Sequence, residues 1–154
     1  MPNIPFNDAH HALHRLAGEW LGRETISPSP WDPAGAVAEA VVRNRVALDG
    51  RVVIQEYDQS RGGTLVFQGH GVSGVEGAGV TLRWWDNWSA TLREFRGVVD
   101  GESVILVSPD PKGQARATWR LGDQAYDYAL EVSPDGVEWS PYLTARYAQA
   151  RATA

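Results

Sequence analysis

Turn signals recur along this chain about every ten residues, and that spacing constrains the fold more than any other feature of the sequence. The segments between the turns alternate β-branched or aromatic residues with polar ones, as strands with one buried face do. The turns are rich in Gly, Pro, Asp and Asn and lie at residues 27–33, 49–50, 61–63, 76–79, 86–87, 100–101, 110–113, 122–123 and 134–136. Nine turns predict about ten short antiparallel strands.

A flat sheet of that size would have two long unpaired edges, whereas closing it into a barrel pairs both of them. We therefore predict an all-β fold, an antiparallel up-and-down β-barrel over residues 18–150, within a single domain spanning residues 1–154. The chain has 154 residues, 43% of them hydrophobic, and no cysteine. It is long enough to bury a core without disulfides, and it contains no thiol nucleophile or thiolate metal ligand.

One segment has helical periodicity, at residues 7–17. Ala9, Ala12, Leu13 and Leu16 form one apolar stripe, and Asn7 or Asp8 precedes the stripe as an N-cap. A helix this short is marginal alone, so we expect its stripe to pack on the barrel before it ends at Gly18.

The charge balance bears on partners and location. There are 14 Lys and Arg against 19 Asp and Glu, for a net charge of -5. This balance argues against a nucleic-acid partner. The chain begins with no basic and apolar leader, and it has no apolar run long enough to cross a membrane. We predict a cytoplasmic protein with no nucleic-acid or membrane partner.

Hairpin register predicts which side chains face inward. A tight turn at residues 49–50 places Arg43 opposite Glu56 on the outside. It places Val42, Asn44, Val46, Val53, Gln55 and Tyr57 inside. The same reasoning at residues 77–78 groups Leu65, Phe67, Trp84 and Asp86 with Gly69 and Gly71, which leave room for a ring against the backbone. At residues 100–101 it groups Phe95, Val104 and Leu106.

Several short segments together resemble a known family. Gly18-Glu-Trp20 is similar to the Gly-x-Trp that opens the first strand of lipocalin-like, calycin-type barrels. Those barrels pack a late arginine over this tryptophan, so the resemblance implies structural closure by Trp20 and Arg146. With residues 27–33, 45–50 and 133–139, the segment resembles the bacterial domain-of-unknown-function family 1579 across nearly the whole chain. The resemblance implies a lipocalin-like barrel without an established activity.

A more distant resemblance is to the nitrobindins, ten-stranded barrels that bind haem through a histidine near the chain end. No histidine follows His70 in this sequence, so the late strands lack that ligand. His70, in a predicted strand between two glycines, is the remaining candidate for haem. Register places it opposite Trp85 and on the outside, and we expect no cofactor.

Other candidate sites have simpler structural interpretations. His10 and His14 have i, i+4 spacing that suits zinc, but no thiolate is present, and we favour polar residues on the solvent side of the helix. Arg116 and Arg120 are suited to a carboxylate ligand, but the alternation of Ala115, Ala117 and Trp119 favours an outward position for both. Residues 133–139 are interpreted as a turn in which Ser133 and Asp135 bond local amides.

The leading functional hypothesis is a non-enzymatic barrel that binds a small apolar molecule in its lumen. Its predicted ligand-binding residues are Trp31, Asn44, Gln55, Tyr57, Phe67, Trp84, Asp86 and Phe95. The alternatives are an enzyme of isomerase or cyclase type, a nitrobindin-like haem protein, and a filled barrel acting as a homodimeric interaction module. The enzyme would use Tyr57 and carboxylates from a set of inward candidates: Glu24, Tyr57, Asp86, Glu94, Arg116, Arg120, Glu131 and Tyr147. Its discriminating sign is an inward Asp or Glu hydrogen-bonded to Tyr or His in a closed pocket.

Overall fold

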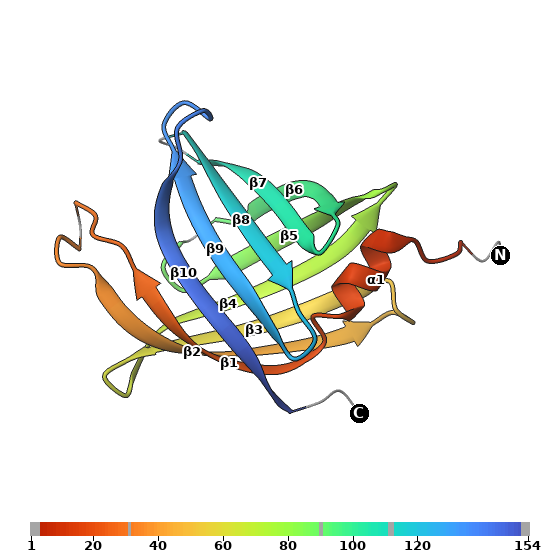
Figure 1. The fold of residues 1–154 in the computed structure, drawn as a ribbon, viewed down its shortest axis with the longest axis horizontal. Coiled ribbons are helices and arrows are strands. Elements are labelled where there is room, and N and C mark those ends of the chain that lie inside the picture. The colour runs from red at the N-terminus through yellow and green to blue at the C-terminus, as the bar shows by residue number, and fades with distance from the viewer. Residues whose placement is uncertain (1–3, 31, 90, 111–112, 152–154) are drawn as a thin grey trace.

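A computed structural model describes residues 4–30, 32–89, 91–110 and 113–151. Within these ranges the chain forms one short helix and ten antiparallel strands that close into a barrel (Figure 1). The elements are α1 (Asp8–His14), β1 (Gly18–Ile26), β2 (Ala36–Ala47), β3 (Val52–Arg61), β4 (Thr64–Glu76), β5 (Gly79–Asp86), β6 (Arg93–Asp100), β7 (Ser103–Asp110), β8 (Gly113–Leu121), β9 (Ala125–Ser133) and β10 (Ser140–Arg151).

Each strand pairs with its neighbours in the chain, and β1 completes the ring by pairing with β10. The predicted all-β, up-and-down barrel is therefore confirmed. The predicted registers are also confirmed: Arg43 lies opposite Glu56, and His70 lies opposite Trp85. One assignment is wrong, because a bulge between Gln59 and Ser60 shifts the pairing of β3 with β4. Leu65, which was expected inside, is consequently 50% exposed. Val46, also expected inside, lies near the end of β2 and is 37% exposed.

The helix α1 closes one end of the barrel (Figure 1). Its predicted stripe of Ala9, Ala12, Leu13 and Leu16 is buried. Asn7 is the N-cap, with its side chain accepting hydrogen bonds from the amides of Ala9 and His10. The helix ends at His14, earlier than expected, and residues 15–17 continue as tighter turns. In the described part of the chain, no helix is long and apolar enough to cross a membrane.

Polar contacts join this helical segment to all four hairpins at the same end. The side-chain amide of Asn7 donates to the carbonyl of Gly77 between β4 and β5 (2.8 Å), and His14 Nε2 donates to that of Gly50 between β2 and β3 (2.8 Å). Arg15 reaches the other two hairpins, through the carboxylate of Glu102 (2.6 Å) and the carbonyl of Gly122 (3.4 Å). The helical segment is therefore a fixed plug, and access to the interior is from the opposite end.

Candidate functional site

The barrel contains a cavity of about 990 Å³. Its walls include aromatic and aliphatic side chains from most of the strands. At the end away from α1, the walls are continued by residues from three loops: Pro28 and Ser29, Trp88 and Ser89, and Pro134. The cavity is thus a lumen with its mouth between the β1–β2, β5–β6 and β9–β10 loops.

Six of the predicted ligand-binding residues line this lumen: Gln55, Tyr57, Phe67, Trp84, Asp86 and Phe95. Asn44 has a different place. Its amide donates to the carbonyl oxygen of Leu16 (2.8 Å), where the helical segment meets the barrel. The remaining candidate, Trp31, lies outside the described residues. The structure therefore brings most of the predicted set together, and their binding of a ligand stays a prediction.

Glycines on β4 determine where the Trp84 ring lies. A Cβ atom on Gly69 would lie 2.1 Å from Trp84 Cζ2, so the indole packs directly against the backbone, as expected from the glycine gaps. Trp84 Nε1 donates to the carboxylate of Asp86 (2.9 Å). The same carboxylate accepts from the amides of Trp88 (3.0 Å) and Ser89 (2.7 Å). Asp86 therefore fixes both a lumen ring and the turn at the mouth.

A buried carboxylate is the main polar feature of the barrel interior. Glu24 on β1 is 0% exposed. One of its oxygens accepts hydrogen bonds from the phenol groups of Tyr57 on β3 (2.5 Å) and Tyr147 on β10. The other accepts from the amide of Gln59 (2.8 Å), which also donates to the oxygen of Tyr57 (3.2 Å). Tyr57, Gln59 and Tyr147 line the lumen, with Glu24 behind them.

The surroundings keep these phenols protonated. Burial raises the pKa of Tyr57 and Tyr147 well above the usual range, and the negative charge of Glu24 raises both further. Burial also raises the pKa of Tyr126 and Tyr128, which lie beside them in the lumen. The phenols of Tyr57 and Tyr147 therefore stay hydrogen-bond donors to Glu24. Their oxygens can still accept hydrogen bonds from a group in the cavity.

This cluster was only partly predicted. Glu24 and Tyr147 stand among the inward candidates but not among the predicted ligand-binding residues, and Gln59 is in neither set. A signal existed for two of them: Glu24 is four residues from Trp20 on one strand, and Gln59 is two residues from Tyr57. Gly22 provides the space for the cluster, because a Cβ there would lie 2.3 Å from the Tyr147 ring.

The predicted packing of Arg146 over Trp20 is wrong. Trp20 is buried, with its indole nitrogen donating to the carbonyl of Leu16 (2.9 Å) and its ring edge-on to Tyr126 at 4.8 Å. Arg146 points outward and pairs with Asp127 (3.0 Å). Neighbouring residues on a strand face opposite sides, so the inward position of Tyr147 places Arg146 outside. Trp20 still helps to close the barrel end, with Tyr126 as its partner.

All four histidines lie away from the lumen lining. His70 is on the outer face beside Glu56 (2.6 Å), as its register predicted. His10 is buried at the helix start, where the backbone N–H of Asn7 donates to its ring, so its expected solvent-side position is wrong. Burial is the main cause that lowers the pKa of His10, and the positive charge of Arg51 lowers it further. The alternative of a histidine-ligated haem in the lumen does not fit these positions. Among the described residues, no three His, Asp or Glu side chains form a group suited to a metal ion.

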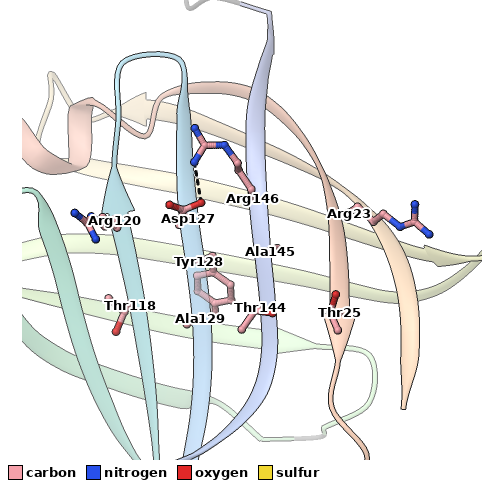
Figure 2. A pocket seen from close by; sticks show the side chains of 10 residues that line it. All are labelled: Arg23, Thr25, Thr118, Arg120, Asp127, Tyr128, Ala129, Thr144, Ala145 and Arg146. Carbon is pink, nitrogen blue, oxygen red and sulfur yellow. Dashed lines mark hydrogen bonds and ion pairs between the residues drawn. The ribbon is translucent and has the colours of Figure 1, made fainter. Parts of the chain in front are cut away.

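A shallow outer groove of about 490 Å³ crosses β1, β10, β9 and β8. Figure 2 shows Arg146 reaching Asp127, with Arg23 and Arg120 pointing away from this pair. The outward position of Arg120 is the expected one, and Arg116 lies outside with Glu131 (3.0 Å). The inward alternation of Ala115, Ala117 and Trp119 is confirmed by their burial. Ser133 and Asp135 accept hydrogen bonds from local amides, as predicted.

The closed strand order and the single plugged end define a calycin-like barrel. No protein-family model matches the chain, and no curated protein matches its sequence. Among solved structures, the chain is similar to "Crystal Structure of Rv2717c from M. tuberculosis", with a TM-score of 0.72 and 16% sequence identity. The similarity covers 96% of this chain and 100% of that chain. At this identity the similarity supports the fold alone.

Proposed function

We propose that this protein binds a small, largely apolar molecule in its lumen. The observation that carries the proposal is the cavity of about 990 Å³, which is lined mainly by aromatic and aliphatic side chains and is continued by loops at one end. Ligand sites are typically concave and mostly apolar, with a few polar groups that orient the ligand. Here Tyr57, Gln59 and Tyr147 are the orienting groups, and Glu24 fixes their positions.

Binding of an uncharged naphthalene dye such as prodan tests this proposal. Ala117 lies on β8, lines the lumen and is 1% exposed, whereas its neighbour Thr118 faces the outer groove. We expect the dye to bind the wild-type protein with a blue-shifted emission. Ala117→Phe is expected to weaken binding at least ~10-fold by filling the lumen, and Thr118→Phe to change it less than ~2-fold. Absence of dye binding, or equal weakening by both variants, would reject lumen binding.

The Glu24 cluster supports a second candidate function, an enzyme of isomerase type. An inward carboxylate hydrogen-bonded to tyrosine inside a pocket is the sign expected for this alternative. A phenol oxygen takes a proton from the carbon next to a substrate carbonyl, and the same phenol passes its own proton to Glu24. The electron pair of the broken C–H bond passes into an enolate, which takes a proton from the same phenol at another carbon, while Glu24 returns its proton to the phenol. Substrate and product are then isomers, and the protein is unchanged.

Solvent deuterium exchange tests this second candidate. An uncharged cyclic ketone, tetralone, is incubated with the protein in heavy water, and deuterium next to its carbonyl is followed by NMR. The enzyme proposal expects exchange above the buffer rate that is lost in Glu24→Gln and retained in Asp127→Asn, a variant of the exposed outer face. Exchange at the buffer rate in the wild-type protein argues for binding without catalysis.

Membership in family 1579 stays a prediction, since it rests on the sequence segments alone. The same holds for the absence of nucleic-acid and membrane partners, for a homodimer and for cytoplasmic location.

A further inference from the structure

The Glu24 cluster has a charge imbalance that bears on the kind of ligand the lumen takes. Every hydrogen bond that the structure gives Glu24 comes from a neutral group, either a phenol or an amide. The ion pairs that the structure shows go to other acids: Asp32, Asp58, Asp127, Glu56, Glu76, Glu94, Glu102 and Glu131. A carboxylate in low-dielectric surroundings exerts a stronger field on its neighbours than the same charge in water.

The charged residues that line the lumen are Arg61, Asp86, Arg93 and Glu94, and each makes contacts with residues other than Glu24. Arg61 at the mouth pairs with Asp32 (3.2 Å), and Glu94 pairs with Arg96. Asp86 accepts three hydrogen bonds from the β5–β6 turn and Trp84. Arg93 lies on β6, and its guanidinium carbon is 5.3 Å from the centre of the Phe95 ring, in a cation–π contact. β6 and β1 lie five strands apart in the ring of ten described strands, so Arg93 and Glu24 belong to opposite walls.

The phenol oxygens provide the contact atoms on the Glu24 wall. Each phenol uses its hydrogen on Glu24, which leaves its oxygen as an acceptor. The oxygen of Tyr57 receives one hydrogen bond, from Gln59 (3.2 Å). The oxygen of Tyr147 receives none from another described side chain. A donor group on a ligand therefore finds two acceptors here, with a carboxylate directly behind them.

Aromatic rings surround the same position. The centre of the Tyr57 ring lies 6.0 Å from that of Trp84 and 5.8 Å from that of Phe67. The Tyr147 ring lies 5.0 Å from Tyr126 and 6.3 Å from Tyr128. Aromatic faces attract cations and also contact apolar groups, so the wall suits a cationic head on an apolar body.

We infer that the lumen prefers ligands in which an apolar, ring-sized body carries a protonated amine, bound by the oxygens of Tyr57 and Tyr147 in front of Glu24. The inference deepens the proposed function and rests on it. It specifies a ligand class that a purely apolar cavity would not select.

Calorimetric titration with three probes of one ring system tests the inference: naphthylmethylamine, naphthalenemethanol and naphthoic acid, at neutral pH. We expect the amine to bind the wild-type protein at least ~10-fold more tightly than the alcohol. A carboxylate probe that binds as tightly as the amine, or an alcohol that equals it, overturns the inference. If the alcohol binds and the amine has no advantage, lumen binding stands and the ligand class is wrong. If none of the probes binds, the proposed function itself fails.

Variants locate the preference within the lumen. Glu24→Gln keeps the size of the side chain and removes its charge, so the amine-to-alcohol ratio is expected to fall to about one while the alcohol still binds. Asp127→Asn removes a carboxylate from the outer face and is expected to keep the wild-type ratio. If Glu24→Gln does not fold, Tyr147→Phe serves instead, because it removes one acceptor and is expected to lower the ratio. An unchanged ratio in the folded variant would contradict the assigned position.

Discussion

Glu24 is a fully buried acidic side chain, which is rare in proteins unless its hydrogen-bonding capacity is met. Two phenols and one amide meet it here, and they come from strands β3 and β10 on either side of the β1–β2 pair. Loss of one partner from a buried charged group costs more than loss of an average hydrogen bond. The cluster therefore contributes to stability as well as to the shape of the lumen.

Tyr147→Phe tests this contribution. The variant removes one donor to Glu24 and keeps the ring against Gly22, so we expect the free energy of unfolding to fall by ~1–3 kcal/mol. Urea denaturation measures the change. The matched control is Tyr126→Phe, another buried lumen tyrosine, whose phenol has no hydrogen bond to another described side chain. Equal effects of the two substitutions would show that Glu24 does not depend on Tyr147.

Gly69→Ala tests the close packing of Trp84. The added methyl group would meet the indole at 2.1 Å, so Trp84 must move, and overpacking of this kind typically costs ~1–3 kcal/mol. Gly74→Ala is the control on the same strand, because its nearest neighbour would be 3.8 Å away. Denaturation and tryptophan emission measure the two effects. A variant at Gly69 that retains wild-type stability and emission would contradict the packing.

At this scale, alternation along single strands predicted well which residues face inward, including Tyr57 and Trp84. The Glu24 cluster was harder to predict because Glu24 and Tyr147 are 123 residues apart. Their contact depends on the pairing of the first and last strands, for which no hairpin turn sets the register. The failed Arg146 assignment came from the same pair of strands, where the resemblance alone indicated a partner.

Among the elements, α1 has a position that its own sequence only partly explains. Its apolar stripe predicted packing on the barrel, and the turns predicted the hairpins. The contacts of Asn7, His14 and Arg15 with those hairpins could not be predicted, because they join segments that local patterns treat separately. Beyond the helix end, the carbonyl of Leu16 accepts hydrogen bonds from the side chains of Trp20 and Asn44, and the bond from Asn44 also joins segments that local patterns treat separately.

Asn7 allows the two roles of its side chain to be separated. Asn7→Ala removes both the N-cap and the hydrogen bond to Gly77, and we expect it to lower the free energy of unfolding by ~1–2 kcal/mol. Asn7→Asp keeps an acceptor for the helix amides and loses only the donor to Gly77. Its expected loss is less than half as large, because Asp is an equally good N-cap. Equal losses in thermal or urea unfolding would assign the effect to the Gly77 contact instead.

For the whole molecule, the buried tyrosines predict a steep loss of stability in alkali. The pKa values of Tyr57, Tyr126, Tyr128 and Tyr147 are raised in the folded state, mainly by burial. Below pH ~10 both states keep these protons, and the full stability is present. Above it the unfolded chain releases protons that the folded barrel retains, so the free energy of unfolding falls by ~1.4 kcal/mol per tyrosine and pH unit.

The four tyrosines together correspond to a loss of ~5 kcal/mol per pH unit, and typical domains have ~5–15 kcal/mol in all. We therefore expect tyrosinate absorbance to rise together with loss of the near-ultraviolet circular dichroism, in one cooperative step between pH ~10 and ~12. Ionisation of these tyrosines in an intact barrel would contradict the burial of their phenol groups.

The central claim is that the lumen is a binding site, and a crystal structure with bromonaphthalene tests it most directly. Bromine gives an anomalous signal that locates an uncharged, ring-sized molecule without reference to its affinity. The account predicts a bromine peak inside the barrel, among Trp84, Tyr57 and Tyr147. Bromine found only on the outer face, or a lumen closed by the protein's own side chains, would contradict it.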